Sequence, residues 1–299
     1  MQKATQTVMP KITQEMIKAY DDYTHLTLDR RDFMQKLKRL TGSAAAAAAV
    51  APMLAASNAK AAMVAEDDQR LKAETITWPG ADGQTMAGYL AVAADASGPL
   101  PAVMVIHENR GLNPHIQDVA RRMALEGFLA LGPDFLTPAG GTPEDEDKAR
   151  DMIGALDRAQ TTANAVATVA FLKTHPMSNG KVGVIGFCWG GGLVNQTAVN
   201  AGADLAAAVP YYGAQPAAND VGKIKSKMLL QYAGLDERIN AGIPDYEAAL
   251  KAAGVDYEVY IYEGANHAFN NDTSEARYNK EAADVAWSRT VAFLKETLG

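Results

Sequence analysis

The sequence predicts an α/β protein whose strands form a mostly parallel, doubly wound sheet. Short strand-like segments alternate with helix-like segments along most of the chain, which is typical of this class. Residues 102–106 are continuously apolar, as expected for a strand that is buried on both faces. With 299 residues, 48% of them hydrophobic, the chain is long enough for one large domain with a substantial core.

The individual elements follow from local patterns. The first two expected strands alternate in polarity and flank a turn at 80–83 that contains two glycines. Strands are expected at 74–78, 86–92, 102–106, 128–131, 182–185, 206–210, 228–232 and 257–262. Helices are expected at about 116–126, 161–173, from about 193, and at 281–298, with an acidic helix start at 143–147.

Composition excludes some classes of function. The net charge of -7 and the lack of a dense basic stripe argue against a nucleic-acid partner. One cysteine forbids an intramolecular disulfide and is compatible with either cytoplasm or periplasm. We expect no cofactor and no bound metal, and the oligomeric state is not indicated.

The first seventy residues differ from the rest, and we expect an N-terminal arm at 1–70 before a single domain at 71–299. Residues 29–36 contain Arg30 and Arg31 and resemble a twin-arginine export motif, and an alanine-rich run follows to about residue 56. Ala59-Lys-Ala61 offers a small-x-small cleavage site. This pattern favours export to the periplasm.

A cytoplasmic protein with a helical arm is the alternative, because residues 14–23 and 33–40 are both compatible with helices. The run at 40–56 is too short and too weakly apolar for a stable membrane span.

The segment Lys181-Val-Gly-Val-Ile-Gly-Phe-Cys-Trp-Gly-Gly-Gly192 contains the single cysteine and predicts a nucleophile elbow. In this turn of α/β-hydrolases the nucleophile sits between a buried strand and a helix, so small residues must flank it. Gly186 and Gly190 occupy those positions around Cys188. The start of the helix directs unpaired N–H groups at the sulfur, which favours a thiolate. The alternative is that Cys188 is a small buried apolar residue.

Candidate partners follow in the chain order typical of a catalytic triad. Asp236 comes just after the strand at 228–232, although Glu237 and Asp245 lie nearby and a helix or turn cap is its alternative role. His267 comes just after the strand at 257–262. For the remaining histidines we expect structural or solvated roles for His25, His115 and His175, whereas His107 ends a strand beside the expected site.

The loop after the strand at 102–106 contains a carboxylate, Glu108, close to the expected thiol. In this fold the loop supplies one backbone N–H of the oxyanion hole, and the residue after the nucleophile, Trp189, supplies the other. Alternatively, Glu108 pairs with Arg110 or Arg122 and only holds the loop.

Four separated motifs together resemble the dienelactone hydrolases (carboxymethylenebutenolidases) over about residues 76–298. They are His107-Glu108, Gly186-Phe-Cys-Trp-Gly-Gly191, Asp236 and Gly264-Ala-Asn-His-Ala-Phe269. The chain is most similar to a subgroup with a His-Glu-Asn-Arg-Gly-Leu loop and an arginine-pair N-terminal arm.

The resemblance implies a Cys188–His267–Asp236 triad that opens lactones or cleaves esters through a thioester. It also implies that Glu108 pairs with the thiol and helps to deprotonate it, and that backbone N–H groups of Trp189 and Asn109 form the oxyanion hole.

The sequence departs from this family at two arginines that bind the substrate carboxylate. The equivalent positions hold Asn271 and Pro138. Arg110 or Arg238 are candidate substitutes. Aromatic residues are candidates for an apolar pocket, namely Trp189, Tyr211, Tyr212 and Phe269. We therefore expect a hydrolase of small esters or lactones, with a non-enzymatic thiol redox or ligand-binding protein as the alternative.

Overall fold

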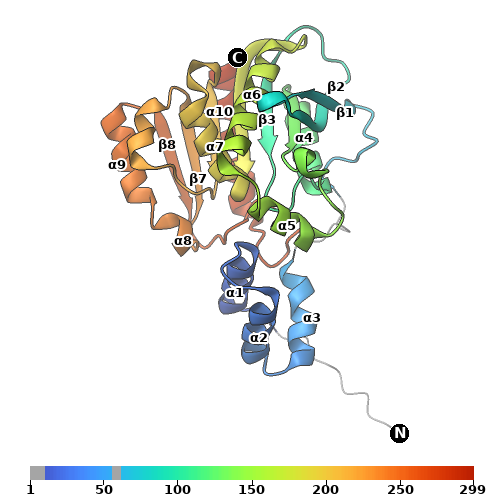
Figure 1. The fold of residues 1–299 in the computed structure, drawn as a ribbon, viewed down its shortest axis with the longest axis vertical. Coiled ribbons are helices and arrows are strands. Elements are labelled where there is room, and N and C mark those ends of the chain that lie inside the picture. The colour runs from blue at the N-terminus through green and yellow to red at the C-terminus, as the bar shows by residue number, and fades with distance from the viewer. Residues whose placement is uncertain (1–10, 56–61) are drawn as a thin grey trace.

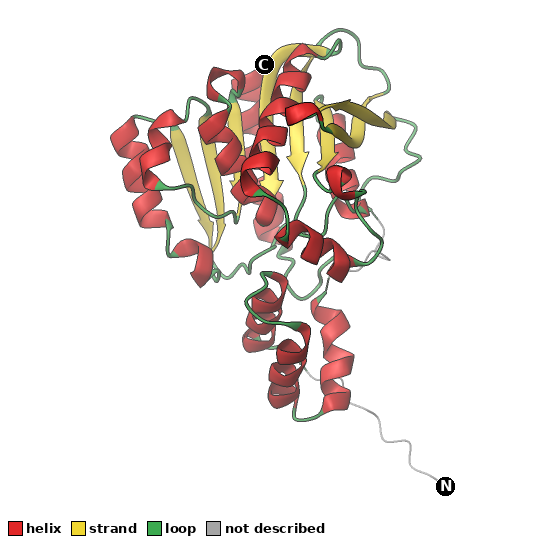
Figure 2. Ribbon diagram, in the orientation of Figure 1, coloured by secondary structure: helices red, strands yellow, loops and turns green. Residues whose placement is uncertain are grey.

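The computed structural model describes residues 11–55 and 62–299, and its described strands form one eight-stranded sheet (Figure 2). The strands are β1 (Leu71–Pro79), β2 (Thr85–Ala93), β3 (Leu100–Ile106), β4 (Leu129–Asp134), β5 (Ser178–Phe187), β6 (Ala207–Tyr211), β7 (Lys227–Ala233) and β8 (Tyr257–Tyr262). Their order is β1-β2-β4-β3-β5-β6-β7-β8. β2 is antiparallel to both β1 and β4, and all other neighbours are parallel. The predicted mostly parallel sheet is confirmed.

Helices cover both faces of this sheet (Figure 1). They are α4 (Pro114–Leu125), α5 (Glu146–Gly154), α6 (Arg158–Thr174), α7 (Trp189–Asn200), α8 (Glu237–Asn240), α9 (Ile243–Ala253) and α10 (Lys280–Leu298). Apolar residues of α6, α7 and α9 pack into one core cluster, and those of α4 and α10 pack into the other. The central strands β3 to β7 are buried between these two layers, which explains their continuous apolar runs, whereas the edge strands β1 and β8 are largely exposed or half-buried.

Three of these helices differ from the sequence prediction. α7 begins at Trp189, four residues before the predicted start near residue 193, and α8 and α9 were not predicted. Glycine is unfavourable inside helices, so the prediction placed the start of this helix after Gly190, Gly191 and Gly192. The glycines are needed for close packing, because a Cβ on Gly191 would lie 2.5 Å from the carbonyl oxygen of Tyr211.

The N-terminal arm is folded into three helices, α1 (Gln14–Thr24), α2 (Arg30–Thr41) and α3 (Ala44–Leu54). Thr13, Asp29 and Ser43 cap their N-termini with side-chain oxygens. The three helices enclose an apolar cluster of their own. This three-helix arm lies below the carboxyl ends of the strands, beside α5 and α8 (Figure 1).

The predicted export motif lies at the start of α2. Arg30 forms an ion pair of 2.5 Å with Asp147 on α5. Ala59-Lys-Ala61, the predicted cleavage site, lies outside the described residues. Within the part of the chain that the structure describes, every helix is too short or too polar to cross a membrane. Export and the division at residue 70 stay predictions.

Candidate active site

Cys188 occupies a strained turn between β5 and α7. Its φ and ψ angles are 56° and −115°, in a region that residues other than glycine rarely adopt. Its N–H donates to the carbonyl oxygen of Tyr211 at 3.1 Å. A Cβ on Gly186 would lie 2.6 Å from the carbonyl oxygen of Gly190, and one on Gly190 would lie 2.7 Å from that of Ile106. The turn therefore requires both glycines, as expected for a nucleophile elbow.

Asp236 and His267 form a buried pair at the ends of β7 and β8. Nδ1 of His267 lies 2.5 Å from Oδ2 of Asp236, and the two residues are 2% and 5% exposed. A carboxylate accepts, so Nδ1 carries a hydrogen and Nε2 is left to face Cys188. Oδ1 of Asp236 also accepts from the N–H of Ile239 at 3.2 Å. The predicted roles of Asp236 as orienting carboxylate and as helix cap are thus compatible with each other.

The charges around His267 favour its protonated form. Burial opposes the charge, but the carboxylate of Asp236 and the thiol group of Cys188 hold the pKa of His267 well above its usual value. Burial would raise the pKa of Asp236, yet its contact with His267 holds that pKa below the usual value. Nε2 of His267 is buried and has no hydrogen-bond partner among the described residues.

A second histidine, His25 at the end of α1, reaches the same thiol from the arm. Its Nε2 lies 3.3 Å from Sγ of Cys188 and accepts from Arg238 at 3.0 Å. Its Nδ1 donates to the carbonyl oxygen of Asp21 at 2.7 Å. Burial, followed by the positive charges of His267 and Arg238, holds the pKa of His25 well below its usual value. The sequence predicted only a structural or solvated role for His25, because a residue 163 positions from Cys188 gives no local signal of this contact.

The arm closes the space above Cys188. The cavity beside the thiol has a volume of about 20 Å³, enough for about one water molecule. Tyr20, Thr24 and His25 of the arm form part of its lining. Asn109 donates through its side-chain amide to the carbonyl oxygen of Thr24 at 2.6 Å, and Arg110 reaches the hydroxyl of Tyr20 at 3.3 Å. An ester larger than water therefore requires the arm to move.

Glu108 is buried beside this cavity. Its Oε2 accepts from Nδ2 of Asn271 at 2.7 Å, and its Oε1 has no hydrogen-bond partner among the described residues. The alternative pairing with Arg110 or Arg122 was wrong. Arg110 instead donates to the carbonyl oxygen of Glu146 at 2.6 Å and pairs with Asp147. The guanidinium of Arg122 lies 4.1 Å from the ring centre of Trp287.

The two backbone groups predicted for the oxyanion hole lie at either side of the elbow. Trp189 is the first residue of α7, so its N–H is one of those that a helix leaves without an internal partner. Asn109 follows Glu108 in the loop after β3. The ring of Trp189 stacks on His107 with 5.1 Å between ring centres, which fixes the position of this turn.

The aromatic pocket expected from the sequence does not form in this closed arrangement. Tyr211 is fully buried and its hydroxyl bonds Thr290 at 2.7 Å, while Phe269 packs in the core. Tyr212 packs behind His267 with ring centres 4.9 Å apart. None of these aromatic residues lines the cavity, whereas Arg110, a predicted substitute for the missing arginines, does.

Sequence reasoning missed Arg277, which lines the cavity and is 8% exposed. Its Nε donates to Oγ of Ser274 at 3.0 Å, and its NH1 lies 3.6 Å from Oδ1 of Asp21 on the arm. Burial opposes its charge, but nearby acidic groups, Glu108 among them, hold the pKa of Arg277 above its usual value. The loop before α10 carries no pattern that singles out this arginine. A cation is thus present although Asn271 and Pro138 replace the family's arginines.

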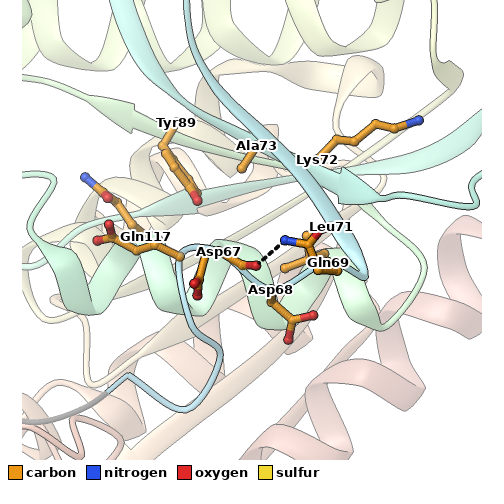
Figure 3. Close-up of a pocket in the computed structure, with 9 residues that line it drawn as sticks. Asp67, Asp68, Gln69, Leu71, Lys72, Ala73, Tyr89 and Gln117 are labelled. Atoms are coloured by element: carbon orange, nitrogen blue, oxygen red, sulfur yellow. Dashed lines mark hydrogen bonds between the residues drawn. The ribbon is translucent and has the colours of Figure 1, made fainter.

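A separate hollow of about 510 Å³ lies at the edge of the sheet, beside β1, β2 and α4 (Figure 3). Asp67, Tyr89 and Gln117 are among its lining residues, and Gln69 donates to the carbonyl oxygen of Asp67 at 2.8 Å. None of the predicted site residues lines it.

A thiol in a strained strand–helix turn, with a buried His–Asp pair at the ends of parallel strands, defines the class of α/β-hydrolases. The chain belongs to the dienelactone hydrolase family, whose model matches residues 86–298. The protein is accordingly a hydrolase.

Individual relatives agree with this assignment. A protein of Saccharolobus solfataricus named "Putative carboxymethylenebutenolidase" is 34% identical over 250 residues, which cover 72% of this chain and 95% of the relative. The structure of "Putative Dienelactone Hydrolase" from Klebsiella pneumoniae matches with a TM-score of 0.69 and 28% identity, covering 76% of this chain and 99% of the neighbour. A dienelactone hydrolase-like promiscuous phosphotriesterase, P91, from metagenomic libraries matches with a TM-score of 0.68 and 28% identity, covering 77% and 100%.

These relatives are matched almost end to end, while about a quarter of this chain lies outside each match. The family model begins at residue 86, after the three-helix arm. The arm is thus an addition to the family domain as the model defines it.

Proposed function

We propose that the protein hydrolyses a small ester or lactone through a thioester on Cys188. The observation that carries the proposal is the position of Cys188. It lies in a turn with positive φ at the N-terminus of α7, beside the buried His267–Asp236 pair. The names of the family and of its relatives support an ester or lactone as the substrate class.

The proposed reaction follows from the donors and acceptors around the sulfur. His267 takes the thiol proton through Nε2, while Asp236 holds its Nδ1. Sγ attacks the substrate carbonyl, and the N–H groups of Trp189 and Asn109 stabilise the oxyanion. His267 returns the proton to the leaving alkoxide. A water molecule, deprotonated by His267, then attacks the thioester, releases the acid and returns the proton to Sγ.

Glu108 is proposed to assist deprotonation of Cys188. Its unpartnered Oε1 is free to accept a thiol proton, whereas Oε2 is held by Asn271. Burial in the same small cavity keeps the carboxylate close to the thiol. Substrate entry would move the thiol proton to Oε1 of Glu108, from which it passes to Nε2 of His267, so the thiol is active only when substrate is present.

Arg277 bears on the choice of substrate. It is one of two buried arginines that line the cavity beside Cys188, and its acidic partner in the closed arrangement is Asp21 of the arm, whereas Arg110 pairs with Asp147. If the arm leaves, the guanidinium loses that partner and is available to a substrate carboxylate. We therefore propose an ester or lactone that carries a free carboxylate.

The arm is proposed to control access and to serve as an export segment. Cleavage after residue 61 would remove His25, Tyr20 and Asp21 from the cavity and expose Cys188. N-terminal sequencing of the mature protein from its host tests this step. A mature chain that begins near residue 62 supports it, and a mature chain that retains Met1 contradicts it.

Replacing the sulfur tests the catalytic mechanism. Cys188→Ala is expected to lower kcat for an activated ester by about 10⁴-fold or more, since the nucleophile is lost. Rapid quenching of the unmodified protein should trap an acyl group on the peptide that contains Cys188, as seen by mass spectrometry.

His175→Gln is a control, because His175 precedes β5 at the opposite end of that strand from Cys188. Its turnover should equal that of the unmodified protein. Equal turnover in Cys188→Ala would contradict the mechanism.

A further inference from the structure

Three side chains that ligate transition metals converge where the arm meets the catalytic pair. They are His25, Cys188 and His267, and one ligand atom from each lies within 4.8 Å of the others. The shortest separation, 3.3 Å, joins Nε2 of His25 to Sγ of Cys188. The sequence predicted no metal site, because the two histidines belong to different parts of the chain.

Both imidazoles are oriented as metal ligands usually are. A histidine that binds a metal commonly donates its other ring N–H to a carboxylate or a backbone carbonyl. Nδ1 of His267 donates to Asp236, and Nδ1 of His25 donates to the carbonyl oxygen of Asp21. Both Nε2 atoms therefore carry a lone pair, which is unpartnered among the described residues on His267 and bonded by Arg238 on His25. Nε2 of His267 is buried without a hydrogen-bond partner among the described residues.

The spacing suits a four-coordinate ion. With Zn–S of about 2.3 Å and Zn–N of about 2.0–2.1 Å, neighbouring ligand atoms in a tetrahedral site lie roughly 3.3–3.6 Å apart. Closing the widest separation from at most 4.8 Å requires shifts of about 1 Å. The guanidinium of Arg238, which now bonds Nε2 of His25, belongs to an exposed residue on α8 and is free to turn into solvent. A water molecule would complete the coordination.

We propose that His25, Cys188 and His267 form a site for one zinc ion, or a similar divalent transition metal, that joins the arm to the catalytic pair. The sulfur binds as thiolate, and the one proton that Cys188 and His267 hold between them passes to solvent. The ion occupies both the nucleophile and the base, so the zinc-loaded protein does not hydrolyse esters. A chelator restores the thiol and the imidazole.

The surrounding charges tolerate the ion. Asp21, Asp236 and Glu108 are acidic, while Arg277 and Arg238 are basic. The negative charges of the three carboxylates and the thiolate balance the positive charges of the divalent ion and the two arginines. The proposal goes beyond ester hydrolysis, because binding needs no turnover.

The test is zinc binding by the full chain, measured by competition with a chromogenic chelator at neutral pH. The unmodified protein and His175→Gln should each bind one zinc ion. His25→Gln should bind at least about 100-fold more weakly, because one ligand is lost. Cobalt in place of zinc should give a thiolate charge-transfer band that Cys188→Ala abolishes. Equal zinc affinity in His25→Gln and the unmodified protein would overturn the proposal.

X-ray absorption by the zinc-loaded unmodified protein keeps the proposal testable if a variant does not fold. One sulfur and two imidazole nitrogens are expected, and a coordination sphere without sulfur or with a single imidazole overturns the site. These measurements are independent of hydrolysis. A chain that binds zinc but shows no esterase activity after a chelator has removed the ion would refute the proposed function alone, and esterase activity without zinc binding would refute this site alone.

Discussion

Two histidines from different parts of the chain meet at Cys188 with their ring centres 4.8 Å apart, and their surroundings differ. His267 belongs to the hydrolase side, and its Nδ1 donates to the carboxylate of Asp236. His25 belongs to the arm side, and its Nδ1 donates to the backbone carbonyl oxygen of Asp21. The pKa of His267 is held above its usual value by nearby negative charge, and the pKa of His25 is held below it by burial and positive charge. The imidazole of His267 is thus favoured in its protonated form, and the imidazole of His25 is favoured in its neutral form.

This difference indicates different tasks. A base that must take a proton needs a carboxylate behind it, because the imidazolium is then stabilised. A neutral imidazole that only contacts the thiol covers it without competing for its proton. In the proposed mechanism the hydrolase side supplies the reacting groups, and the arm side lines the cavity beside the thiol.

Among tests of this comparison, a large effect is expected at Arg277, which lines the cavity beside Cys188 and pairs with Asp21 of the arm. Arg277→Ala should lower kcat/KM about 10- to 100-fold for an ester with a free carboxylate, because a charge-assisted bond is lost. It should leave an uncharged ester of similar size almost unchanged. Arg158→Ala is the control, since Arg158 is exposed at the start of α6 and does not line the cavity. Equal losses on both esters would mean that Arg277 only supports the fold.

The arm side is tested by weakening the arm's own core. Leu37 is fully buried in the cluster of the three helices, so Leu37→Ala should destabilise the arm by about 2–5 kcal/mol. Alkylation of Cys188, the single cysteine, should then become at least about tenfold faster. Val285→Ala, at an exposed position of α10, should leave the rate unchanged. An unchanged rate in Leu37→Ala would show that the closed arm does not protect the thiol.

A smaller effect is expected from pH. The folded pKa of His25 lies below that of the unfolded chain, so its neutral form contributes stability above about pH 6.5. That contribution is lost as the pH falls through 6.5 toward the folded pKa. Between pH 7.5 and 5.5 the free energy of unfolding should fall about 1 kcal/mol further in the unmodified protein than in His25→Gln, by urea denaturation.

Other groups that face His25 titrate in both proteins and cancel in this comparison. The folded pKa values of His267 and Asp21 are both raised, so acid stabilises the fold through each of them. Arg238 and Asp236 keep their charges in this range. Parallel pH curves for the two proteins would contradict the assignment of a lowered pKa to His25.

Much of the hydrolase side could be predicted because its signals are local. The apolar run of each central strand predicts that the strand is buried. Gly186 and Gly190 predict the strained turn between them. Asp236 and His267 follow strands whose carboxyl ends meet at one edge of the sheet, so chain order alone predicted their approach. The aromatic residues were misplaced, because an apolar ring at a strand end suits a core as well as a pocket.

By itself, the sequence determined the sheet, the strained turn at Cys188 and the two residues that pair beside it. These features depend on short-range sterics and on strand periodicity, which are set by residues close together in the chain. Only the tertiary structure decided that the arm folds over this turn, that His25 meets the thiol and that Arg277 lies against Asp21. Those contacts join segments up to 256 positions apart, between Asp21 and Arg277. They depend on how two separate cores pack against each other, which no local pattern encodes.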